Sequence, residues 1–443
     1  MKDGLRGGAR VAVLLAAVGG LLFDGFELGL MPVASLSVSK ALLGTAFTPA
    51  LGGEWFARFT ASLMFGAAMG GIFLGGLGDR IGRTRALGVS VLFYSVFAGL
   101  GAWARTQEEM MLLRFLVGLG VGGVWPNSVA LAAECWPGRS RPVIAGVMGA
   151  ALNAGILLLS QVARAWPVSE DSWRWLFHLA AAPALLGIAA LTVVPESPLW
   201  HAAMSGSGTH PATTTCKASG PGPSRLLQLF RPPIRRLTLW GMLLGSIPMV
   251  GAWAASKWMI PWADKVGAAA GAPGYKALTQ GAWAFGAVAG SFVGAQVAAA
   301  LGRRLSYALI SLGATVLTSA MFLATEPLRP GFLWVVGAQG FVSTLFFGWL
   351  PLYLPELFPT RVRAAGSGMA YNVGRFATAA GVLGAGWLFA SMGGSYPKVG
   401  AACGMVYLLG MVAALRAPDT AAHDLGQAAP SSPVRREPHG DAT

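Results

Sequence analysis

Long, uninterrupted apolar blocks constrain this sequence more than any other feature. Val11 to Leu30, Val143 to Ala163 and Leu305 to Ala324 each approach the roughly 20 residues that an α-helix needs to cross a bilayer. Only 11% of the 443 residues are charged, against about a quarter in soluble domains. A single signal peptide would not account for a dozen such blocks. We therefore predict an all-α, multi-pass membrane protein.

Twelve membrane segments can be drawn from these blocks, six on each side of a polar stretch. Their predicted bounds are 11–33, 58–78, 86–104, 110–135, 142–164, 175–194, 237–262, 278–300, 305–325, 331–354, 364–387 and 398–415. We predict two pseudo-symmetric six-helix bundles, at 1–200 and 237–416. The stretch 201–236 between them is predicted to be a flexible linker that ends in a basic amphipathic segment. The tail, 417–443, is predicted to be disordered.

Lys and Arg are unevenly shared between the loops on the two sides of the predicted membrane. Most of them fall on the side that holds the N-terminus, the linker and the tail. The positive-inside rule places that side in the cytoplasm, so we expect both termini to be cytoplasmic in a cell-membrane protein. The formal net charge of +14 is spread over these loops instead of forming one patch, which argues against nucleic-acid binding.

No sequence pattern indicates an enzyme, a metal site or a cofactor. The three cysteines and five histidines lack metal-ligand spacing. We also find no Gly-rich phosphate loop and no nucleophile elbow. We therefore expect no enzymatic activity, no metal and no cofactor. The expected partners are the lipid bilayer, protons and a small-molecule substrate, and we expect a monomer.

Two loop motifs recur in both halves of the chain. Gly82 in LGDRIGR pairs with Gly302 in AALGRR, and Glu134 in AAECWPGRSR pairs with Glu356 in LPELFPTRVR. Both pairs have nearly the same offset. Two independent segments with nearly one offset indicate a duplicated six-helix unit, and parallel repeats of this kind occur in transporters.

Several of these segments resemble the major facilitator superfamily of transporters. GGLGDRIGR (75–83) is similar to the family's loop between helices two and three. RFLVGLGVGGVWPNSVALAAE (114–134) resembles helix four of its metabolite:proton symporters, which include the aromatic-acid and sugar-porter branches. PESPLW (195–200) and ELFPTRVRAAGSG (356–368) resemble the loops after helices six and ten, and DGFE (24–27) the acidic helix-one motif of the aromatic-acid symporters. The resemblance implies a secondary transporter that works by alternating access.

Two acidic residues in the first segment, Asp24 and Glu27, are candidate proton-coupling groups. At about 1.5 Å per residue, Asp24 lies roughly 21 Å beyond Arg10, near or past the middle of the membrane. Glu27 lies one turn further on the same face. A carboxylate at that depth is costly unless it faces a cavity, has a partner or takes up a proton. The alternative is that one of the two is a structural ion-pair or hydrogen-bond partner.

Arg375, in the eleventh segment, is the candidate substrate-binding cation. Its planar guanidinium suits a carboxylate, and the resemblance adds that organic-anion members of the superfamily place a cation in this helix. Asn372 shares its face, and Asn127 and Asn153 lie near mid-depth in the fourth and fifth segments. The alternatives are an internal salt bridge, for instance from Arg375 to Asp24, and amides that only join helices.

A lysine and three tryptophans receive structural interpretations. Lys257 is expected to lie roughly 30 Å along the seventh segment, near the outer interface, where its amine would snorkel to water. Trp125, Trp253 and Trp349 could wall a pocket, but aromatic residues at helix ends more often anchor the interface or pack helices.

Charged residues in the cytoplasmic loops predict a gate. An acid at the inner end of helix two can cap the positive N-terminus of a neighbouring helix, which by resemblance is helix eleven. Such a cluster would hold the inside closed and must break when the inside opens. The positive-inside rule alone explains the arginines but not the acids. The predicted members are Asp79, Arg80, Arg83, Glu134, Arg141, Glu356 and Arg363.

These features favour proton-coupled symport of a small polar metabolite, with an organic carboxylate as the favoured substrate. One alternative is a sugar or polyol transporter, by symport or facilitated diffusion. The seventh and tenth segments hold few Asn and Gln for sugar hydroxyls, Gln339 being the main exception. The other alternative is a non-transporting nutrient sensor, for which the tail after Ala417 is too short an output segment.

Overall fold

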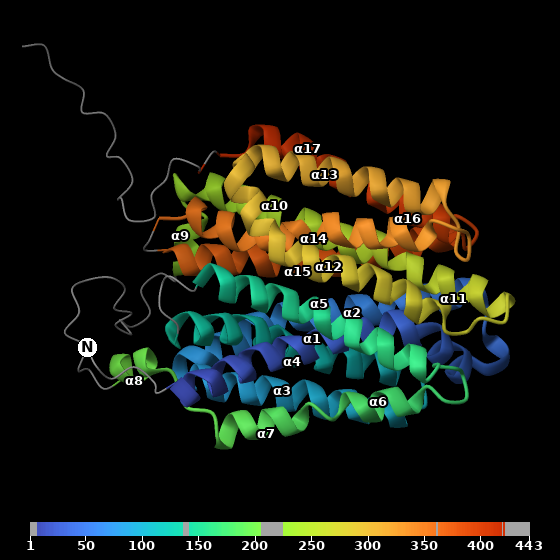
Figure 1. Ribbon diagram of the computed structural model, residues 1–443, viewed down its shortest axis with the longest axis horizontal. Helices are drawn as coiled ribbons and strands as arrows, with labels where there is room; N and C mark the ends of the chain where they lie inside the picture. Colours follow the sequence, from blue (N-terminus) through green and yellow to red (C-terminus); the bar gives the residue numbers. More distant parts are fainter. Residues whose placement is uncertain (1–6, 136–140, 205–224, 360–361, 419, 421–443) are drawn as a thin grey trace, which may run out of the picture.

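The computed structural model describes residues 7–135, 141–204, 225–359, 362–418 and 420, and this part of the chain contains helices and no strands (Figure 1). Twelve stretches of helix in it are long and apolar enough to cross a membrane, which confirms the prediction of twelve segments. Of the predicted tail, only Ala417, Pro418 and Thr420 fall within the described residues.

The spans are built from the following elements. Those before the linker are α1 (Gly7–Leu43), α2 (Pro49–Ile81), α3 (Arg83–Leu100), α4 (Gln107–Cys135), α5 (Arg141–Ala165) and the consecutive α6 (Arg174–Ala180) and α7 (Ala184–Thr192). Those after it are the consecutive α10 (Ile234–Val250) and α11 (Met259–Ala269), then α12 (Tyr275–Leu301), α13 (Arg303–Ser319), α14 (Phe332–Leu357), α15 (Arg363–Ser391) and the consecutive α16 (Tyr396–Gly404) and α17 (Val406–Arg416). The short α8 (Pro198–Met204) and α9 (Arg225–Leu229) lie between the two groups.

The spans before the linker lie together on one side of the molecule and those after it on the other (Figure 1). We call them the first set and the second set. They meet where α2 packs against α15 and α5 against α12. Helices α8 and α9 lie at one end of the bundle, here named the linker end, and the opposite end is the far end. The predicted domain bounds stay a prediction.

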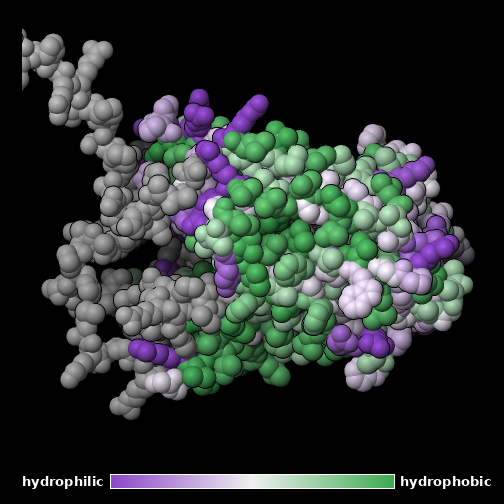
Figure 2. All heavy atoms as spheres, turned by 45° about the horizontal axis from the view of Figure 1, so that its top comes forward, coloured by the Kyte–Doolittle hydropathy of each residue, from purple (hydrophilic) through white to green (hydrophobic). Residues whose placement is uncertain are grey.

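The middle of the molecule presents an apolar surface. Figure 2 shows hydrophobic residues over the centre of the visible face and hydrophilic residues towards its two ends. Large apolar side chains such as Phe73, Leu185 and Trp387 are more exposed than buried. A band of this kind suits contact with lipid, because helices satisfy their backbone hydrogen bonds internally.

The first two helices extend well beyond the predicted segments 11–33 and 58–78. Helix α1 continues through Ser35, Ser37 and Lys40 to Leu43, and α2 already begins at Pro49. Thr48 caps α2, since its hydroxyl accepts a hydrogen bond from the Leu51 amide at 3.2 Å. Hydropathy marks only the apolar part of a helix, whereas backbone hydrogen bonding continues into polar residues.

Glycines bring α1 into backbone contact with α5. A Cβ atom on Gly25 would collide with the carbonyl of Leu152, and one on Gly155 with the carbonyl of Leu22. Small residues at such crossings let helices approach closely. The crossing fixes the position of the α1 turn that carries the two predicted coupling acids.

The seventh span is one helical run, Ile234–Ala269, as predicted at 237–262, but its α-helical hydrogen bonding is interrupted, which the sequence did not predict. After α10 the chain forms a π-helical turn, Gly251–Ala255, then a 3-10 turn, Ser256–Trp258, and only then α11. Pro248 lies within the last turn of α10 and has no amide hydrogen to donate. Kinks and local changes of helix type are commonly found at Pro and at π-turns.

Candidate substrate and coupling site

The two acids of α1 are both buried but have different surroundings. The carboxylate oxygens of Asp24 accept no hydrogen bond from any described residue. Glu27 instead forms an ion pair with Arg114 of α4, in which Nη1 lies 3.1 Å from Oε2 and both side chains are at most 1% exposed. Phe177 covers the Arg114 guanidinium at 5.2 Å from its ring centre. Glu27 thus takes part in a structural ion pair, which is the alternative interpretation that the sequence left open for these acids.

Arg114 was not among the predicted site residues. The only sequence signal for it is an arginine inside an apolar segment, and such residues usually have a partner within the bundle. Sequence spacing along the chain did not indicate that this partner is Glu27, because the contact joins two helices that are far apart in sequence.

Arg375 extends from α15 into the first set. Its Nη1 donates a hydrogen bond to the backbone carbonyl of Ala67 in α2 at 2.9 Å and lies 3.5 Å from that of Gly122 in α4. Its charge also interacts with that of Asp24 across the interface between the sets. A cation of one set is therefore held by backbone oxygens of the other, and the carboxylate whose charge it influences forms no hydrogen bond with any described residue.

Asn372 and two aromatic rings lie beside Arg375. Asn372 packs against Gly71 of α2; its Nδ2 donates to the Gly368 carbonyl at 3.1 Å, and its buried Oδ1 has no hydrogen-bond partner among the described residues. The Arg375 guanidinium lies 5.2 Å from the centre of the Tyr371 ring. Tyr371 in turn stacks on Trp125 of α4, with ring centres 6.1 Å apart and planes 9° from parallel. We call Trp125 and Tyr371 the aromatic wall.

The other two predicted substrate residues differ in position. Asn153 of α5 donates to the Ser291 hydroxyl of α12 at 2.8 Å, so it bridges the two sets. Asn127 of α4 donates to the carbonyls of Leu74 and Gly123 at 3.0 and 2.8 Å, both within the first set. The amide of Asn127 thus joins α2 to α4, which was its alternative interpretation.

Three predicted gate residues, Arg83, Glu134 and Glu356, take part in two equivalent ion pairs at the linker end. Arg83 Nε lies 3.1 Å from Glu134 Oε1 in the first set. In the second set, Arg303 contacts Glu356 through two bonds of 2.8 and 3.0 Å. Arg303 was not predicted, although the alignment of Gly82 with Gly302 already places it opposite Arg83. Both pairs join helices of the same set.

The remaining gate predictions are less complete. Arg80 is exposed. The side chains of Asp79, Arg141 and Arg363 lie outside the part of the chain that is described. Sequence analysis missed Glu196 of the PESPLW motif, whose carboxylate accepts the Thr84 amide at 3.0 and 3.1 Å and so caps the start of α3.

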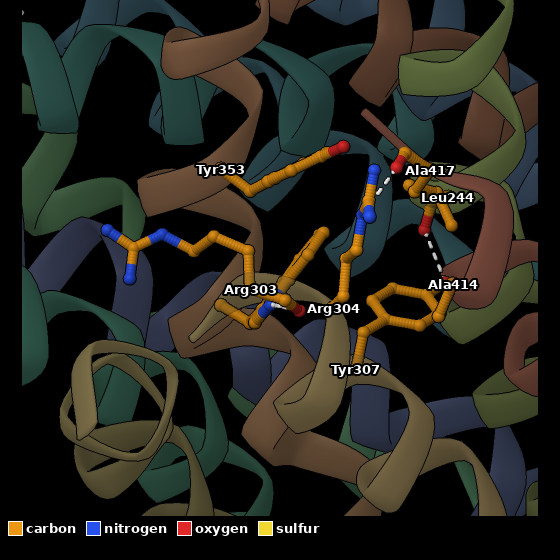
Figure 3. Close-up of a pocket in the computed structure, with 8 residues that line it drawn as sticks. Leu244, Arg303, Arg304, Tyr307, Tyr353, Ala414 and Ala417 are labelled. Atoms are coloured by element: carbon orange, nitrogen blue, oxygen red, sulfur yellow. Dashed lines mark hydrogen bonds between the residues drawn. The ribbon is translucent and has the colours of Figure 1, made fainter. Parts of the chain in front are cut away.

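Further hydrogen bonds at the linker end join α13 to the residue that follows α17 and to α10. Arg304 donates to the Ala417 carbonyl at 2.7 Å, and Tyr307 donates to the Leu244 carbonyl at 2.8 Å (Figure 3). The hollow that these residues line has no room for a water molecule. This part of the structure is therefore closely packed.

The two sets are joined at the far end by a polar cluster that the sequence did not predict. Lys276 of α12 donates to Asp264 of α11 at 3.1 Å and to the Ser37 hydroxyl of α1 at 3.2 Å. Ser37 in turn donates to the Val168 carbonyl at 3.2 Å. We call Lys276, Asp264 and Ser37 the far-end latch.

Aromatic packing closes the same end. Trp258 of the broken seventh span lies 5.2 Å from Phe56 of α2 and 4.9 Å from Phe389 of α15, measured between ring centres. Phe389 also fills the space beside Gly53 of α2, where a Cβ atom would collide with its ring. The far end is therefore closed by contacts between the two sets.

Comparison with known proteins shows a similarity to transporters. Residues 12–225 match the family described as "Sugar (and other) transporter". The cis,cis-muconate transport protein of Acinetobacter baylyi is 28% identical over 408 residues, which cover 90% of this chain and 93% of that protein. The gallate transporter of Pseudomonas putida is 26% identical over 404 residues, 82% of each chain. The chain is thus similar to major facilitator transporters, to the family model over residues 12–225 and to these relatives over most of its length.

The fold agrees with this similarity. The inward-open xylose transporter XylE from E. coli superposes with a TM-score of 0.70 over 94% of this chain and 98% of that one, at 19% sequence identity. The similarity shows a shared fold. The transporter is a multi-pass membrane protein that moves a small molecule, and it is not an enzyme.

Proposed function

We propose that the transporter moves a small organic carboxylate together with protons, by alternating access of its two sets. The observation that carries this proposal is Arg375. Its guanidinium lies at the interface between the sets, where its hydrogen-bond partners are backbone carbonyls of the first set. A carboxylate is a stronger partner for a guanidinium than a neutral carbonyl is, so a substrate anion can replace these bonds.

Asp24 is the proposed coupling group because it competes with the substrate for Arg375. The ionised carboxylate of Asp24 partly compensates the positive charge of Arg375. The protonated carboxyl does not, so the charge of Arg375 is then available to a substrate anion. Burial without a hydrogen-bond donor makes the charged form of Asp24 costly when the arginine pairs with another anion. Loading of the anion and of a proton would then favour each other, as symport requires.

Glu27 stays a candidate coupling group with an additional requirement. Its ion pair with Arg114 must break, or relax, before Glu27 can take up a proton. Removing one partner of a buried pair leaves an uncompensated charge. We therefore assign the first protonation to Asp24 and regard the Glu27–Arg114 pair as support for the α1 turn.

The surroundings of Arg375 favour a planar acid. The aromatic wall of Trp125 and Tyr371 lies beside the guanidinium, and flat conjugated ligands stack well on such rings. The relatives named for muconate and gallate transport support the same substrate class. Asn372 and Asn153 would add hydrogen bonds at the interface, and Asn127 would position α4.

We further propose that the linker end faces the cytoplasm, as the loop charges predict. The far end, which is closed in this structure, would then face outside. The ion pairs Arg83–Glu134 and Arg303–Glu356 would hold the helix ends that meet when the cytoplasmic side closes. Asp79, Arg80, Arg141 and Arg363 complete the proposed gate.

A thermal-stability screen of purified protein tests the substrate class. Ligands that bind only native protein raise its melting temperature, with about 2.7 kcal/mol of added stability at roughly 100 times Kd. We expect stabilisation by muconate, gallate and related acids, and its loss in Arg375→Ala. Stabilisation by xylose and inositol alone would overturn the carboxylate assignment in favour of the sugar alternative.

Uptake into proteoliposomes tests the coupling. In native protein, an inward proton gradient should drive accumulation of the acid that the stability screen identifies. In Asp24→Asn the gradient should no longer drive accumulation, while exchange of labelled for unlabelled substrate continues. Proton-driven accumulation that persists in this variant would contradict the role of Asp24.

A further inference from the structure

Lys257 is a buried cation to which the described residues offer no anion. Five charged side chains are buried in the described part of the structure: Asp24, Glu27, Arg114, Lys257 and Lys276. Glu27 pairs with Arg114, Lys276 pairs with Asp264, and Asp24 interacts with Arg375. Lys257 is 1% exposed, and its Nζ has no hydrogen-bond partner among the described residues.

This position differs from the sequence prediction, in which Lys257 would snorkel to the outer interface. The amine instead lies 3.3 Å from the centre of the Trp283 ring and 5.6 Å from that of Trp253. Lys257 belongs to the 3-10 turn of the broken seventh span. A turn of 3-10 helix changes the directions of successive side chains relative to a continuous α-helix, so helical spacing alone misplaces this lysine.

Hydrogen bonds fix the walls around the amine. Trp283 Nε1 donates to Gln339 Oε1 at 2.7 Å, and Gln339 Nε2 donates to the Ser256 hydroxyl at 2.6 Å. Ser256 directly precedes Lys257, so one glutamine positions both the lysine turn and the ring above it. Aromatic faces stabilise a cation but do not neutralise it. We call Lys257, Trp253 and Trp283 the lysine cage.

The lysine cage borders the interface between the two sets. Trp283 lies on α12 within about two turns of Gln280 and Ser291, which form hydrogen bonds with Ser160 and Asn153 of α5. Trp253, the other wall of the cage, is only partly buried. A ligand held between the sets therefore comes close to this amine.

We propose that Lys257 binds a second carboxylate, so that the substrate is a planar, elongated dicarboxylate. One carboxylate pairs with Arg375 and the other with Lys257. The two cations lie at different depths: Arg375 is near the middle of α15, whereas Trp258, the neighbour of Lys257, contacts Phe389 close to the far end of that helix. The proposal rests on the proposed function, and it adds a second anion to the same site.

Pairs of acids that differ by one carboxylate test the proposal directly. Binding of trans,trans-muconate is compared with binding of sorbate, which has the same conjugated chain and a methyl group in place of one carboxylate. Terephthalate and 4-methylbenzoate form the aromatic pair, and xylose is included. Affinities are measured by isothermal titration calorimetry of purified full-length protein, native and Lys257→Met. Lys265→Met, an exposed lysine of α11, is the matched control.

We expect native protein to bind a dicarboxylate about tenfold or more tightly than its monocarboxylate partner, since a buried ammonium gains a charge-assisted bond. In Lys257→Met the affinity for the dicarboxylate should fall to that of the monocarboxylate, whose own affinity should stay within about twofold. Lys265→Met should change neither. If Lys257→Met does not fold, Lys257→Gln, which keeps most of the side-chain length, takes its place.

The outcomes separate this proposal from the proposed function. Equal binding of both acids by native protein, or a preference that survives removal of the Lys257 charge, overturns the dicarboxylate inference and leaves carboxylate transport standing. Equal loss of both acids in Lys257→Met also overturns it, because the lysine would then be structural. Binding of xylose with neither acid bound, or binding of none of the five compounds, overturns both.

Discussion

Asp24 and Glu27 lie one turn apart on α1, and the packing around them gives them different surroundings. Glu27 has a full ion-pair partner in Arg114, whereas the oxygens of Asp24 have no hydrogen-bond donor among the described residues. A paired acid resists a change of charge, because its partner would be left alone in a medium that solvates charge poorly. This difference is why we propose Asp24, and not Glu27, as the acid that exchanges its proton.

The Glu27–Arg114 pair should therefore behave as a structural unit. We expect Glu27→Gln to destabilise the protein by about 3–5 kcal/mol, because it leaves the Arg114 charge buried and unpaired. The double variant Glu27→Gln/Arg114→Met should recover much of that loss. Chemical denaturation of purified protein in detergent measures both differences.

The exposed pair of Glu54 and Arg58 provides the control for this experiment. Their side chains are 28% and 43% exposed, and surface ion pairs contribute about 0–1 kcal/mol. Glu54→Gln should therefore have little effect on stability. A Glu27→Gln protein as stable as Glu54→Gln would contradict the structural role and would return Glu27 to the coupling candidates.

Among the helices, the close crossing of α1 and α5 depends on the absence of two side chains. Gly25 and Gly155 each face a backbone carbonyl of the other helix. The same crossing places Asp24, the neighbour of Gly25, at a fixed height in the bundle. A wider separation of α1 and α5 would move Asp24 relative to Arg375.

We expect Gly25→Ala to lower stability by about 1–3 kcal/mol, the usual cost of forcing extra atoms into a packed contact. It should also reduce proton-driven uptake more than it reduces substrate exchange, because the coupling acid is displaced. Thermal denaturation and the two transport assays measure these effects. Gly384→Ala is the matched control, since a Cβ atom at Gly384 meets nothing within 4 Å; an equal loss in both variants would contradict the prediction.

In the whole molecule, the two sets touch at the far end through the latch of Lys276, Asp264 and Ser37 and through the rings around Trp258. At the linker end, by contrast, each ion pair joins helices of a single set: Arg83–Glu134 in the first set and Arg303–Glu356 in the second. Opening of the far end must break the contact between Lys276 and Ser37, because it joins α12 to α1. The latch therefore biases the transporter towards the state that is closed at that end.

Removal of the latch should shift the transporter towards the state that is open at the far end. A charge-assisted hydrogen bond contributes roughly 1.5–3 kcal/mol, and about 1.4 kcal/mol corresponds to a tenfold change in an equilibrium. We expect Lys276→Met to raise the rate at which a membrane-impermeant thiol reagent labels a cysteine placed at the buried Ser39 by about tenfold.

The exposed Lys265 again serves as the control for charge removal at this end. Lys265→Met should leave the labelling rate of Ser39→Cys unchanged, and the same proteins without the added cysteine give the background from native thiols. An unchanged rate in Lys276→Met would show that the aromatic contacts alone hold the far end closed.

The sequence by itself determined the fold class and the chemical inventory of the site. Apolar blocks of membrane-spanning length fixed twelve helices, since no other structure satisfies an isolated backbone in lipid. Depth along each helix was enough to single out Asp24, Glu27 and Arg375, because charges at that depth are rare and costly. The repeated loop motifs likewise indicated Glu134 and Glu356 at the linker end.

Only the tertiary structure decided which of these residues meet. Glu27 contacts Arg114, Arg375 reaches the carbonyl of Ala67, and Lys276 contacts Ser37, and each contact joins helices far apart in the chain. Periodicity gives the face and depth of a side chain but not the helix that packs against that face. The break in the seventh span was likewise hidden from hydropathy, and it decided that Lys257 points into the protein. Helix packing pairs Glu27 with Arg114 and Lys276 with Asp264, and among the described residues it leaves Lys257 without a hydrogen-bond partner.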